Sequence, residues 1–159
     1  MKLYRICPEV YLENYDGLGA SYSDGGRWNS PGKPVIYYAC SPATALLELA
    51  NYLPSPRLVP KSYRLGVFKL PPGAPLEDLA DNKWPEDWAQ YPYPATTQAI
   101  GDRWLAAKKA LVLRVPSAAV PGGLDKIALV NPAHPRCKEI RLEHSLTDIF
   151  NKRAFSGVR

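Results

Sequence analysis

The sequence has few residues of the kinds that bind metals or form disulfides: three cysteines and two histidines among 159 residues. Cys7, Cys40 and Cys137 lie far apart, and none belongs to a CxxC pair. This spacing argues against a disulfide framework and against structural zinc, so we expect the cysteines to be small side chains buried in the core. His134 and His144 form no HExxH motif, so we expect no bound metal and interpret His134 as a turn residue.

The sequence also lacks long apolar runs and several familiar enzyme motifs. No apolar segment approaches the roughly 20 residues of a membrane-spanning helix, so we expect no contact with a membrane. The first ten residues lack the apolar region of a secretory signal, which predicts a cytoplasmic protein. Because GxSxG, GxxxxGKS/T and GxGxxG are absent, the sequence does not support an α/β-hydrolase, a P-loop enzyme or a Rossmann site.

Positive charge is concentrated in the last third of the chain. The net charge is +5, and residues 101–159 contain eleven basic and five acidic residues. A basic surface suits a phosphate-bearing ligand, nucleic acid or an acidic protein, and does not choose among them. No DNA- or RNA-binding motif accompanies it. A basic nucleic-acid-binding protein without catalysis nevertheless stays open as an alternative.

Short apolar and alternating segments predict a protein of the α+β class. The helix signals are Ser41-Pro42, which begins a helix to about Leu53, and the i, i+4 spacing of residues 95–109. One domain over residues 1–159 is therefore expected to have a central mixed or antiparallel sheet flanked by helices. The predicted strands are residues 2–6, 35–39, 62–69, 110–116, 126–130 and 138–142.

Three segments are predicted to lie largely outside this framework. Residues 14–34 contain too many Gly, Pro, Asn, Asp and Ser residues for a regular element, and a loop this long in a small domain is often functional. Residues 71–94 are rich in proline and tryptophan, so we expect irregular structure with short helical turns. The tail, residues 146–159, is expected to begin as a short helix and then fray.

The long loop places Arg27 directly after Gly25 and Gly26. The two glycines allow the backbone to approach a ligand closely, and the guanidinium offers five donors in a rigid fork that suits phosphate oxygens. A structural salt bridge explains the arginine equally well. We interpret Trp28, the next residue, as an anchor in the hydrophobic core.

Three further polar residues are candidates for a site. Residues 35–39 are apolar on both faces, which predicts a central strand with Tyr37 and Tyr38 on opposite sides. On a helical wheel Glu48 lies at the margin of the apolar face, a place that suits a site carboxylate, although the wheel alone favours a surface position. Ser117 follows directly after a predicted strand, where it either caps the turn or contributes to a site.

Several sequence blocks occur together in one order within residues 4–135: YRI, GGRWNSPG, VIYYA with SPATALLE, IGDRWL, VLRVPSA and LVNPAHP. In this order they resemble the RES domain family, which is named for an arginine, a glutamate and a serine. The residues of this sequence that match family motifs are Tyr4, Arg5, Arg27, Tyr37, Glu48 and Ser117.

The resemblance implies a fold related to ADP-ribosyltransferases and a bacterial toxin that attacks NAD. Such a toxin cleaves the nicotinamide–ribose bond by hydrolysis or phosphorolysis. Some relatives are described as modifying a protein, so ADP-ribosyl transfer stays an alternative. The resemblance also implies an Xre-like helix-turn-helix antitoxin, and we expect contact with nucleic acid only through that partner. NAD is then a consumed substrate, and no cofactor is expected.

The roles that the resemblance implies follow from the chemistry of the substrate. Loss of nicotinamide leaves an oxocarbenium-like ribose, so Glu48 would stabilise the developing positive charge. Arg27 and Arg5 would hold the pyrophosphate. The remaining implied contacts are stacking on nicotinamide by Tyr37 or Tyr4 and hydrogen bonding to the nicotinamide amide or a ribose by Ser117.

Overall fold

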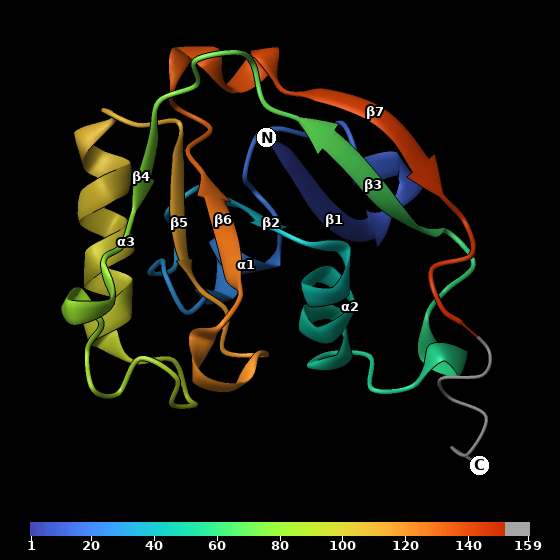
Figure 1. The fold of residues 1–159 in the computed structure, drawn as a ribbon, viewed down its shortest axis with the longest axis horizontal. Helices are drawn as coiled ribbons and strands as arrows, with labels where there is room; N and C mark the ends of the chain where they lie inside the picture. The colour runs from blue at the N-terminus through green and yellow to red at the C-terminus, as the bar shows by residue number, and fades with distance from the viewer. Residues whose placement is uncertain (152–159) are drawn as a thin grey trace.

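A seven-stranded sheet forms the centre of the computed structural model, which describes residues 1–151 (Figure 1). The strand order is β4-β5-β6-β2-β1-β3-β7, in which β4 and β5 are parallel and all other neighbours are antiparallel. The α+β class and the central mixed sheet are therefore confirmed. The strands are β1 (Lys2–Pro8), β2 (Ile36–Ala39), β3 (Tyr63–Lys69), β4 (Leu76–Asp78), β5 (Val112–Pro116), β6 (Lys126–Val130) and β7 (Arg141–Leu146). The α-helices are α1 (Ala20–Asp24), α2 (Pro42–Ala50) and α3 (Ala95–Ala107).

The sheet divides into two halves where β2 meets β1. The strand β1 pairs with β3 along its whole length, and β2 pairs with β6 over all of its residues. In contrast, β1 and β2 pair only at Tyr4 and Ala39. In Figure 1 the strands β5 and β6 accordingly run in a different direction from β3 and β7. The helix α2 follows β2 directly and packs against both β1 and β2, so its residues lie beside the junction of the two halves.

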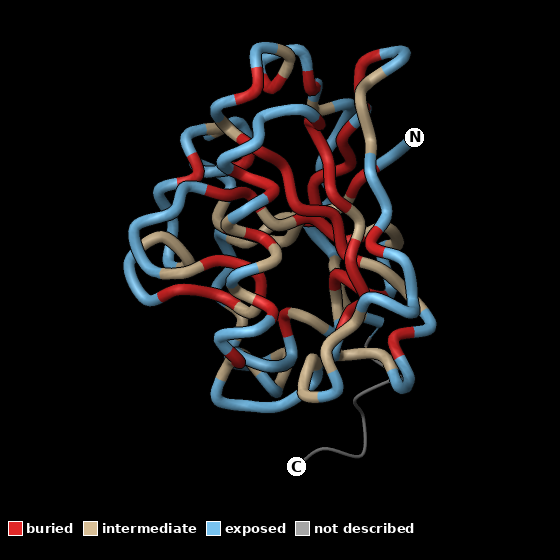
Figure 2. Tube along the Cα trace, turned by 90° about the vertical axis from the view of Figure 1, so that its left-hand side faces the viewer, coloured by how far each residue is buried: buried red, intermediate tan, exposed pale blue. Residues whose placement is uncertain are grey.

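Hydrophobic residues pack on both faces of the sheet. Alternation along β2 sends Ile36 and Tyr38 to one face and Tyr37 to the other, which confirms the predicted opposite directions of the two tyrosines. The face of Tyr37 is covered by α3 on one half of the sheet and by α2 on the other. Figure 2 shows long buried stretches at the centre of the molecule and exposed loops around them. Trp28 is fully buried on the α3 side, which confirms its role as a core anchor.

Two predictions near the C-terminus need correction. Residues 138–142 do not form the last strand, because Pro135–Glu139 form a 3-10 helix. The strand is β7, which begins at Arg141, and its pairing with β3 rather than its own pattern sets its position. No helix occurs in residues 147–151, contrary to the predicted start of the tail, and residues 152–159 lie outside the described part.

Two other elements were not predicted from the sequence. The strand β4 lies within the segment predicted to be irregular, and α1 lies within the long loop. Both are short, with three and five residues, so neither produces a periodic signal. The free thiols Cys7 and Cys137 are buried as expected, and Cys40 is partly buried. No helix in residues 1–151 combines the length and apolar character needed to cross a membrane.

Candidate active site

The glycine-rich loop that carries Arg27 is docked onto α3. Gln98 Nε2 donates to the Gly26 carbonyl at 3.0 Å, and the Asp102 carboxylate accepts from the Ser30 backbone N–H at 3.0 Å. Gln98 and Asp102 are four residues apart, so they lie on the same face of the helix. This face of α3 therefore holds the loop on both sides of the arginine.

Gly101 allows α3 to approach the loop backbone directly. A Cβ atom at this position would lie 1.6 Å from the Trp28 carbonyl oxygen, so no other residue fits without moving the helix or the loop. The contact gives a physical reason for the joint presence of the GGRWN and IGDRWL blocks. The first block forms the loop, and the second forms the helix face that the loop packs against.

Arg27 is held by a segment that lies far away in the sequence. Its Nη1 donates to the backbone carbonyls of Trp88 and Gln90, both at 2.7 Å, and its guanidinium lies 5.2 Å from the ring centre of Tyr93. Among residues 1–151, no carboxylate lies within ion-pair distance of this guanidinium. The structural salt bridge considered from the sequence is therefore not what holds Arg27, and its charge has no acidic partner in the described chain.

The hydroxyl of Tyr37 is built into the same loop. It donates to Asn29 Oδ1 at 2.7 Å and accepts from the Trp28 backbone N–H at 3.1 Å. A Cβ atom on Gly26 would lie 2.7 Å from this hydroxyl, which explains the second glycine of the motif. Burial raises the pKa of Tyr37 far above its ordinary value, so the phenol keeps its proton and remains a donor. Tyr37 thereby fixes the loop that presents Arg27.

Glu48 and Ser117 are in direct contact across the fold. The Ser117 hydroxyl donates to Glu48 Oε1 at 2.6 Å, and its oxygen accepts from the Ala119 backbone N–H at 3.2 Å. Ser117 is fully buried, and Glu48 is half-buried. The serine thus caps the turn after β5 and also contacts the candidate carboxylate. Within residues 1–151 the other carboxylate oxygen, Oε2, has one long contact, 3.4 Å from Asn51 Nδ2.

Glu48 lies on the protein-facing side of α2 rather than on the surface. On the helical wheel it falls between Thr44 and Ala45, and both of these residues are buried. The wheel counts Thr44 as polar, but its hydroxyl donates to the Asp125 carboxylate and is therefore satisfied inside the fold. The surface position that the wheel favours is wrong, because this tertiary hydrogen bond turns the buried side of the helix toward Thr44.

Two tyrosines that were not predicted from the sequence lie close to the site residues, Tyr52 near Glu48 and Tyr93 against Arg27. Tyr52 follows the end of α2, four residues after Glu48, and its hydroxyl is 3.0 Å from the hydroxyl of Tyr93. The ring of Tyr93 in turn faces the Arg27 guanidinium. Although Tyr52 is 70% exposed, partial desolvation of its hydroxyl, the hydrogen bond with Tyr93 and the nearby charge of Glu48 all raise its pKa. The short spacing of Glu48 and Tyr52 in the sequence is the one signal that indicates their proximity.

Tyr4 and Arg5 point to opposite faces of the sheet. Tyr4 pairs with Ala39 and lies in the cluster beside α2, on the same face as Tyr37. Arg5 lies on the other face, with Nη1 3.5 Å from the Tyr11 carbonyl. The structure therefore does not bring Arg5 together with Arg27, and the expectation that both hold one pyrophosphate is corrected. The alternation of side chains along β1 is the physical reason.

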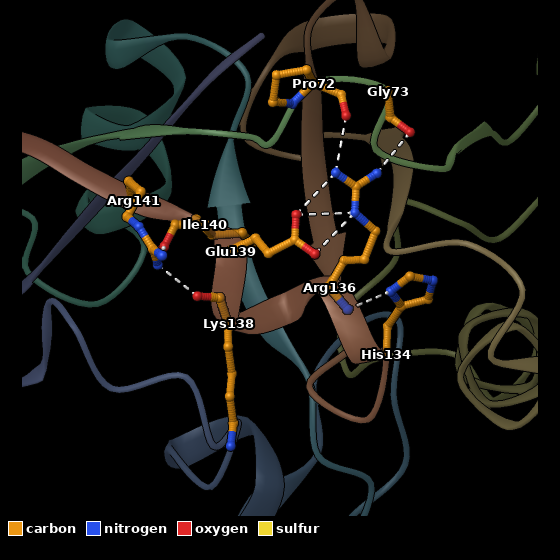
Figure 3. A network of polar contacts seen from close by, with 8 residues as sticks. All are labelled: Pro72, Gly73, His134, Arg136, Lys138, Glu139, Ile140 and Arg141. Carbon is orange, nitrogen blue, oxygen red and sulfur yellow. Dashed lines mark hydrogen bonds and ion pairs between the residues drawn. The ribbon is translucent and has the colours of Figure 1, made fainter.

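A second arginine network lies at the start of the C-terminal 3-10 helix (Figure 3). Arg136 donates from Nη2 to the Pro72 carbonyl at 2.9 Å and from Nη1 to the Gly73 carbonyl at 3.0 Å. It also forms an ion pair of 3.0 Å with Glu139. His134 Nδ1 accepts from the Arg136 backbone N–H at 3.2 Å, which confirms the interpretation of His134 as a turn residue.

Comparison with known proteins identifies the family. A family model described as the RES domain matches residues 2–150. The chain belongs to the RES domain family. A relative named "Toxin Res" from Yersinia enterocolitica is 38% identical over 140 residues, which cover 84% of this chain and 86% of the relative. A relative from Sphingobium sp. named "Prs ADP-ribosylating toxin" is 33% identical over 131 residues, which cover 81% of this chain and 79% of the relative.

The RES fold is also found in a solved structure. The chain is similar to one in the crystal structure of the M. tuberculosis MbcT–MbcA toxin–antitoxin complex, with a TM-score of 0.72 and 19% sequence identity. The similarity covers 99% of this chain and 88% of the other. At this identity the comparison establishes the shared fold.

In this RES domain, Arg27 and Glu48 offer complementary chemistry. The Arg27 guanidinium suits an anionic oxygen, and the Glu48 carboxylate suits a centre that becomes positive. Within residues 1–151, no group of three His, Cys, Asp or Glu side chains is placed to hold a metal ion. The described side chains therefore suit a ligand with a phosphate-like group on one side and a reacting, cation-forming centre on the other.

Proposed function

We propose that the protein is the toxin of a bacterial toxin–antitoxin pair and that it cleaves the nicotinamide–ribose bond of NAD. Membership of the RES domain family, the names of the relatives and the fold shared with a toxin–antitoxin complex support the role of toxin. One observation carries the proposed reaction: the Glu48 carboxylate is held by a buried serine hydroxyl, and the nearby Tyr52 is hydrogen-bonded to Tyr93, whose ring faces an arginine without an acidic partner. NAD presents a pyrophosphate near a ribose whose bond to nicotinamide can break.

The proposed role of Glu48 is to stabilise the ribose cation. As nicotinamide leaves, positive charge develops on the ribose ring, and a fixed carboxylate nearby lowers the barrier. The hydrogen bond from Ser117 orients Oε1, whereas Oε2 has only the long contact with Asn51 among the described residues. Oε2 is thus the oxygen that we assign to a ribose hydroxyl or to the reacting centre.

The proposed role of Arg27 is to bind the pyrophosphate. Its two carbonyl contacts use Nη1 alone, and no bond from Nε or Nη2 occurs within residues 1–151. Those two nitrogens form the fork edge that matches two phosphate oxygens. The carbonyls of Trp88 and Gln90 orient the guanidinium without neutralising it, so the charge remains for the substrate.

The tyrosines divide between stacking and support. Tyr4 lies on the α2 face of the sheet, so we retain it as a stacking partner for nicotinamide. The hydroxyl of Tyr37 is fully engaged within the loop, so we assign Tyr37 the task of holding Arg27 in place, in addition to any ring contact. The proposal uses no cofactor, because NAD is consumed.

A second reaction stays close to the first. One relative carries the name ADP-ribosylating toxin, which favours transfer of ADP-ribose to a protein as the alternative fate of the same intermediate. Water, phosphate or a protein nucleophile would each attack the same ribose carbon. The same residues would therefore be used, and only the product distinguishes the reactions.

The proposal includes a protein partner. The solved relative is a toxin in complex with its antitoxin, and we infer that this toxin is likewise neutralised by an antitoxin, of the Xre-like helix-turn-helix kind. Contact with DNA would then occur through the antitoxin. We place the reaction in the cytoplasm, because a toxin of this kind has to reach the NAD pool of its own cell.

The test is to incubate the purified protein with NAD labelled in the adenosine part. Free labelled ADP-ribose or its phosphate would identify degradation, and label on a protein would identify transfer. Glu48→Gln is the matched control, since it keeps the size of the side chain and removes the charge. Stable NAD in the presence of the wild-type protein, or equal consumption by Glu48→Gln, would overturn the proposal. Salt-sensitive binding to nucleic acid without NAD turnover would instead support the basic nucleic-acid-binding alternative.

A further inference from the structure

Asp125 connects the two elements that carry Glu48 and Ser117. Its backbone carbonyl accepts from the Ser117 N–H at 3.0 Å. Its carboxylate Oδ2 accepts from the Ser41 hydroxyl at 2.6 Å and from the Thr44 hydroxyl. One residue therefore binds both the end of β5, where the serine lies, and the first turn of α2, which leads to the glutamate.

The path from Asp125 to Glu48 runs along one side of α2. Thr44 lies four residues before Glu48, so the two side chains project from the same side of the helix, one turn apart. Ser117 and Asp125 lie at the two ends of the turn between β5 and β6, and the Ser117 N–H to Asp125 bond closes that turn. Fixing the start of α2 to Asp125 thus sets the distance between the carboxylate and the serine hydroxyl.

The bonds from Ser41 and Thr44 to Asp125 form a cross-link between α2 and the β5–β6 turn, which is additional to the ordinary cap of the helix. Ser41 already caps α2, because its oxygen accepts from the Thr44 backbone N–H at 3.2 Å. Among residues 1–151, Asp125 forms no hydrogen bond with Glu48, and its Oδ1 accepts from the Lys126 N–H at 2.8 Å. Burial raises the pKa of Asp125, but the hydrogen bonds from Ser41, Thr44 and Lys126 outweigh it and hold that pKa below its ordinary value. The carboxylate is therefore ionised near neutral pH.

We propose that Asp125 is a positioning residue, which acts through Thr44 and the first turn of α2 to hold Glu48 at hydrogen-bond distance from Ser117. The expected loss of rate rests on the proposed function. The expected geometry, with Glu48 held beside Ser117, does not. Buried Ala45 and Leu49 keep α2 packed on the sheet when the bonds to Asp125 are lost. The helix therefore remains folded but can shift relative to Ser117. A misplaced Glu48 lowers kcat rather than substrate affinity, because the positive charge that it stabilises appears only in the transition state.

The sharpest test is a matched pair at Thr44. Thr44→Val removes the hydroxyl and keeps the shape, whereas Thr44→Ser keeps the hydroxyl. We expect kcat for NAD to fall about 10- to 100-fold in Thr44→Val with KM changed less than about threefold, because small misplacements of a reacting group have effects of this size. We expect Thr44→Ser to retain most of the rate, and Asp125→Ala to behave like Thr44→Val.

A second readout separates this inference from the proposed function. In a crystal structure of Thr44→Val, we expect the Ser117 Oγ to Glu48 Oε1 distance to exceed hydrogen-bond range, whether or not the wild-type protein consumes NAD. A retained contact, or wild-type kcat in Thr44→Val, would overturn the positioning role. If Asp125→Ala fails to fold, the Thr44 pair still decides the question. If the wild-type protein does not consume NAD but the Ser117–Glu48 contact is lost in Thr44→Val, the proposed reaction is rejected and the positioning role of Asp125 is supported.

Discussion

Arg27 and Arg136 are anchored in similar ways but have different electrostatic surroundings. Each guanidinium donates to two backbone carbonyls that lie more than sixty residues away in the sequence. Arg27 donates to Trp88 and Gln90, and Arg136 donates to Pro72 and Gly73. Arg136 additionally pairs with the Glu139 carboxylate, which raises the arginine pKa and lowers that of the glutamate.

The difference shows how a structural arginine and a binding arginine can be told apart. An arginine whose charge is neutralised by a neighbouring carboxylate holds two segments together and attracts an anionic ligand only weakly. Arg27 is held by neutral carbonyls and by the face of Tyr93, so its charge stays uncompensated within residues 1–151. A half-buried charge without a counter-ion is unfavourable for stability alone, which makes it a candidate for function.

The largest expected effect comes from comparing the two carboxylates, Glu48 and Glu139. We expect Glu48→Gln to lower kcat for NAD by about 10³-fold, because it removes the charge that stabilises the ribose cation. Glu139→Gln should leave kcat within about twofold, since it breaks only an exposed ion pair. Steady-state NAD consumption by both variants checks this, and equal losses would remove the distinction between the two networks.

The comparison of the arginines themselves should give the next largest effect. We expect Arg27→Ala to lower kcat/KM about 10²-fold, mainly through a higher KM, because charge-assisted bonds to the pyrophosphate are lost. Arg136→Ala should leave KM unchanged and lower the thermal midpoint instead. Kinetics and melting curves of the two variants test this together. A higher KM in Arg136→Ala would show that the assignment of roles is reversed.

Removing the Tyr37 hydroxyl should have an intermediate effect on both stability and activity. Tyr37→Phe leaves Asn29 Oδ1 and the Trp28 N–H without their partner in a half-buried loop. We expect a loss of about 1–3 kcal/mol in unfolding free energy, and a rise in KM through a less ordered Arg27. Urea unfolding and NAD kinetics provide the two measurements. Tyr38→Phe, on the opposite face of β2, is the control, and we expect it to leave KM unchanged.

The smallest effect concerns the pH dependence of the Arg136–Glu139 pair. The hydrogen bond and charge of Arg136 lower the folded-state pKa of Glu139, so the pair stabilises the fold above the ordinary glutamate pKa, about 4.3. That contribution disappears as the pH falls through the lowered pKa. We expect wild type and Glu139→Gln to differ slightly in urea midpoint at pH 7 and to converge in strong acid. A difference that grows in acid would contradict this sign.

The elements around the site were predictable because each follows from nearby residues. Ser41 and Pro42 begin α2 where the sequence indicates, and β2 lies at the centre of the sheet as its apolar pattern requires. The C-terminal strand was misplaced because its position depends on pairing with β3. Arg5 matches a family motif, but the match alone could not show that its side chain lies on the face of β1 opposite to Tyr4.

The sequence by itself determined which chemical groups are present and which elements carry them: an arginine after two glycines, a tyrosine on a central strand and a glutamate on a capped helix. Only the tertiary structure decided their partners. Arg27 meets carbonyls 61 and 63 residues away, and Glu48 meets a serine 69 residues away. Helices and strands form through preferences that act over a few neighbouring residues, whereas contacts over such separations depend on how the sheet, α2 and α3 pack together.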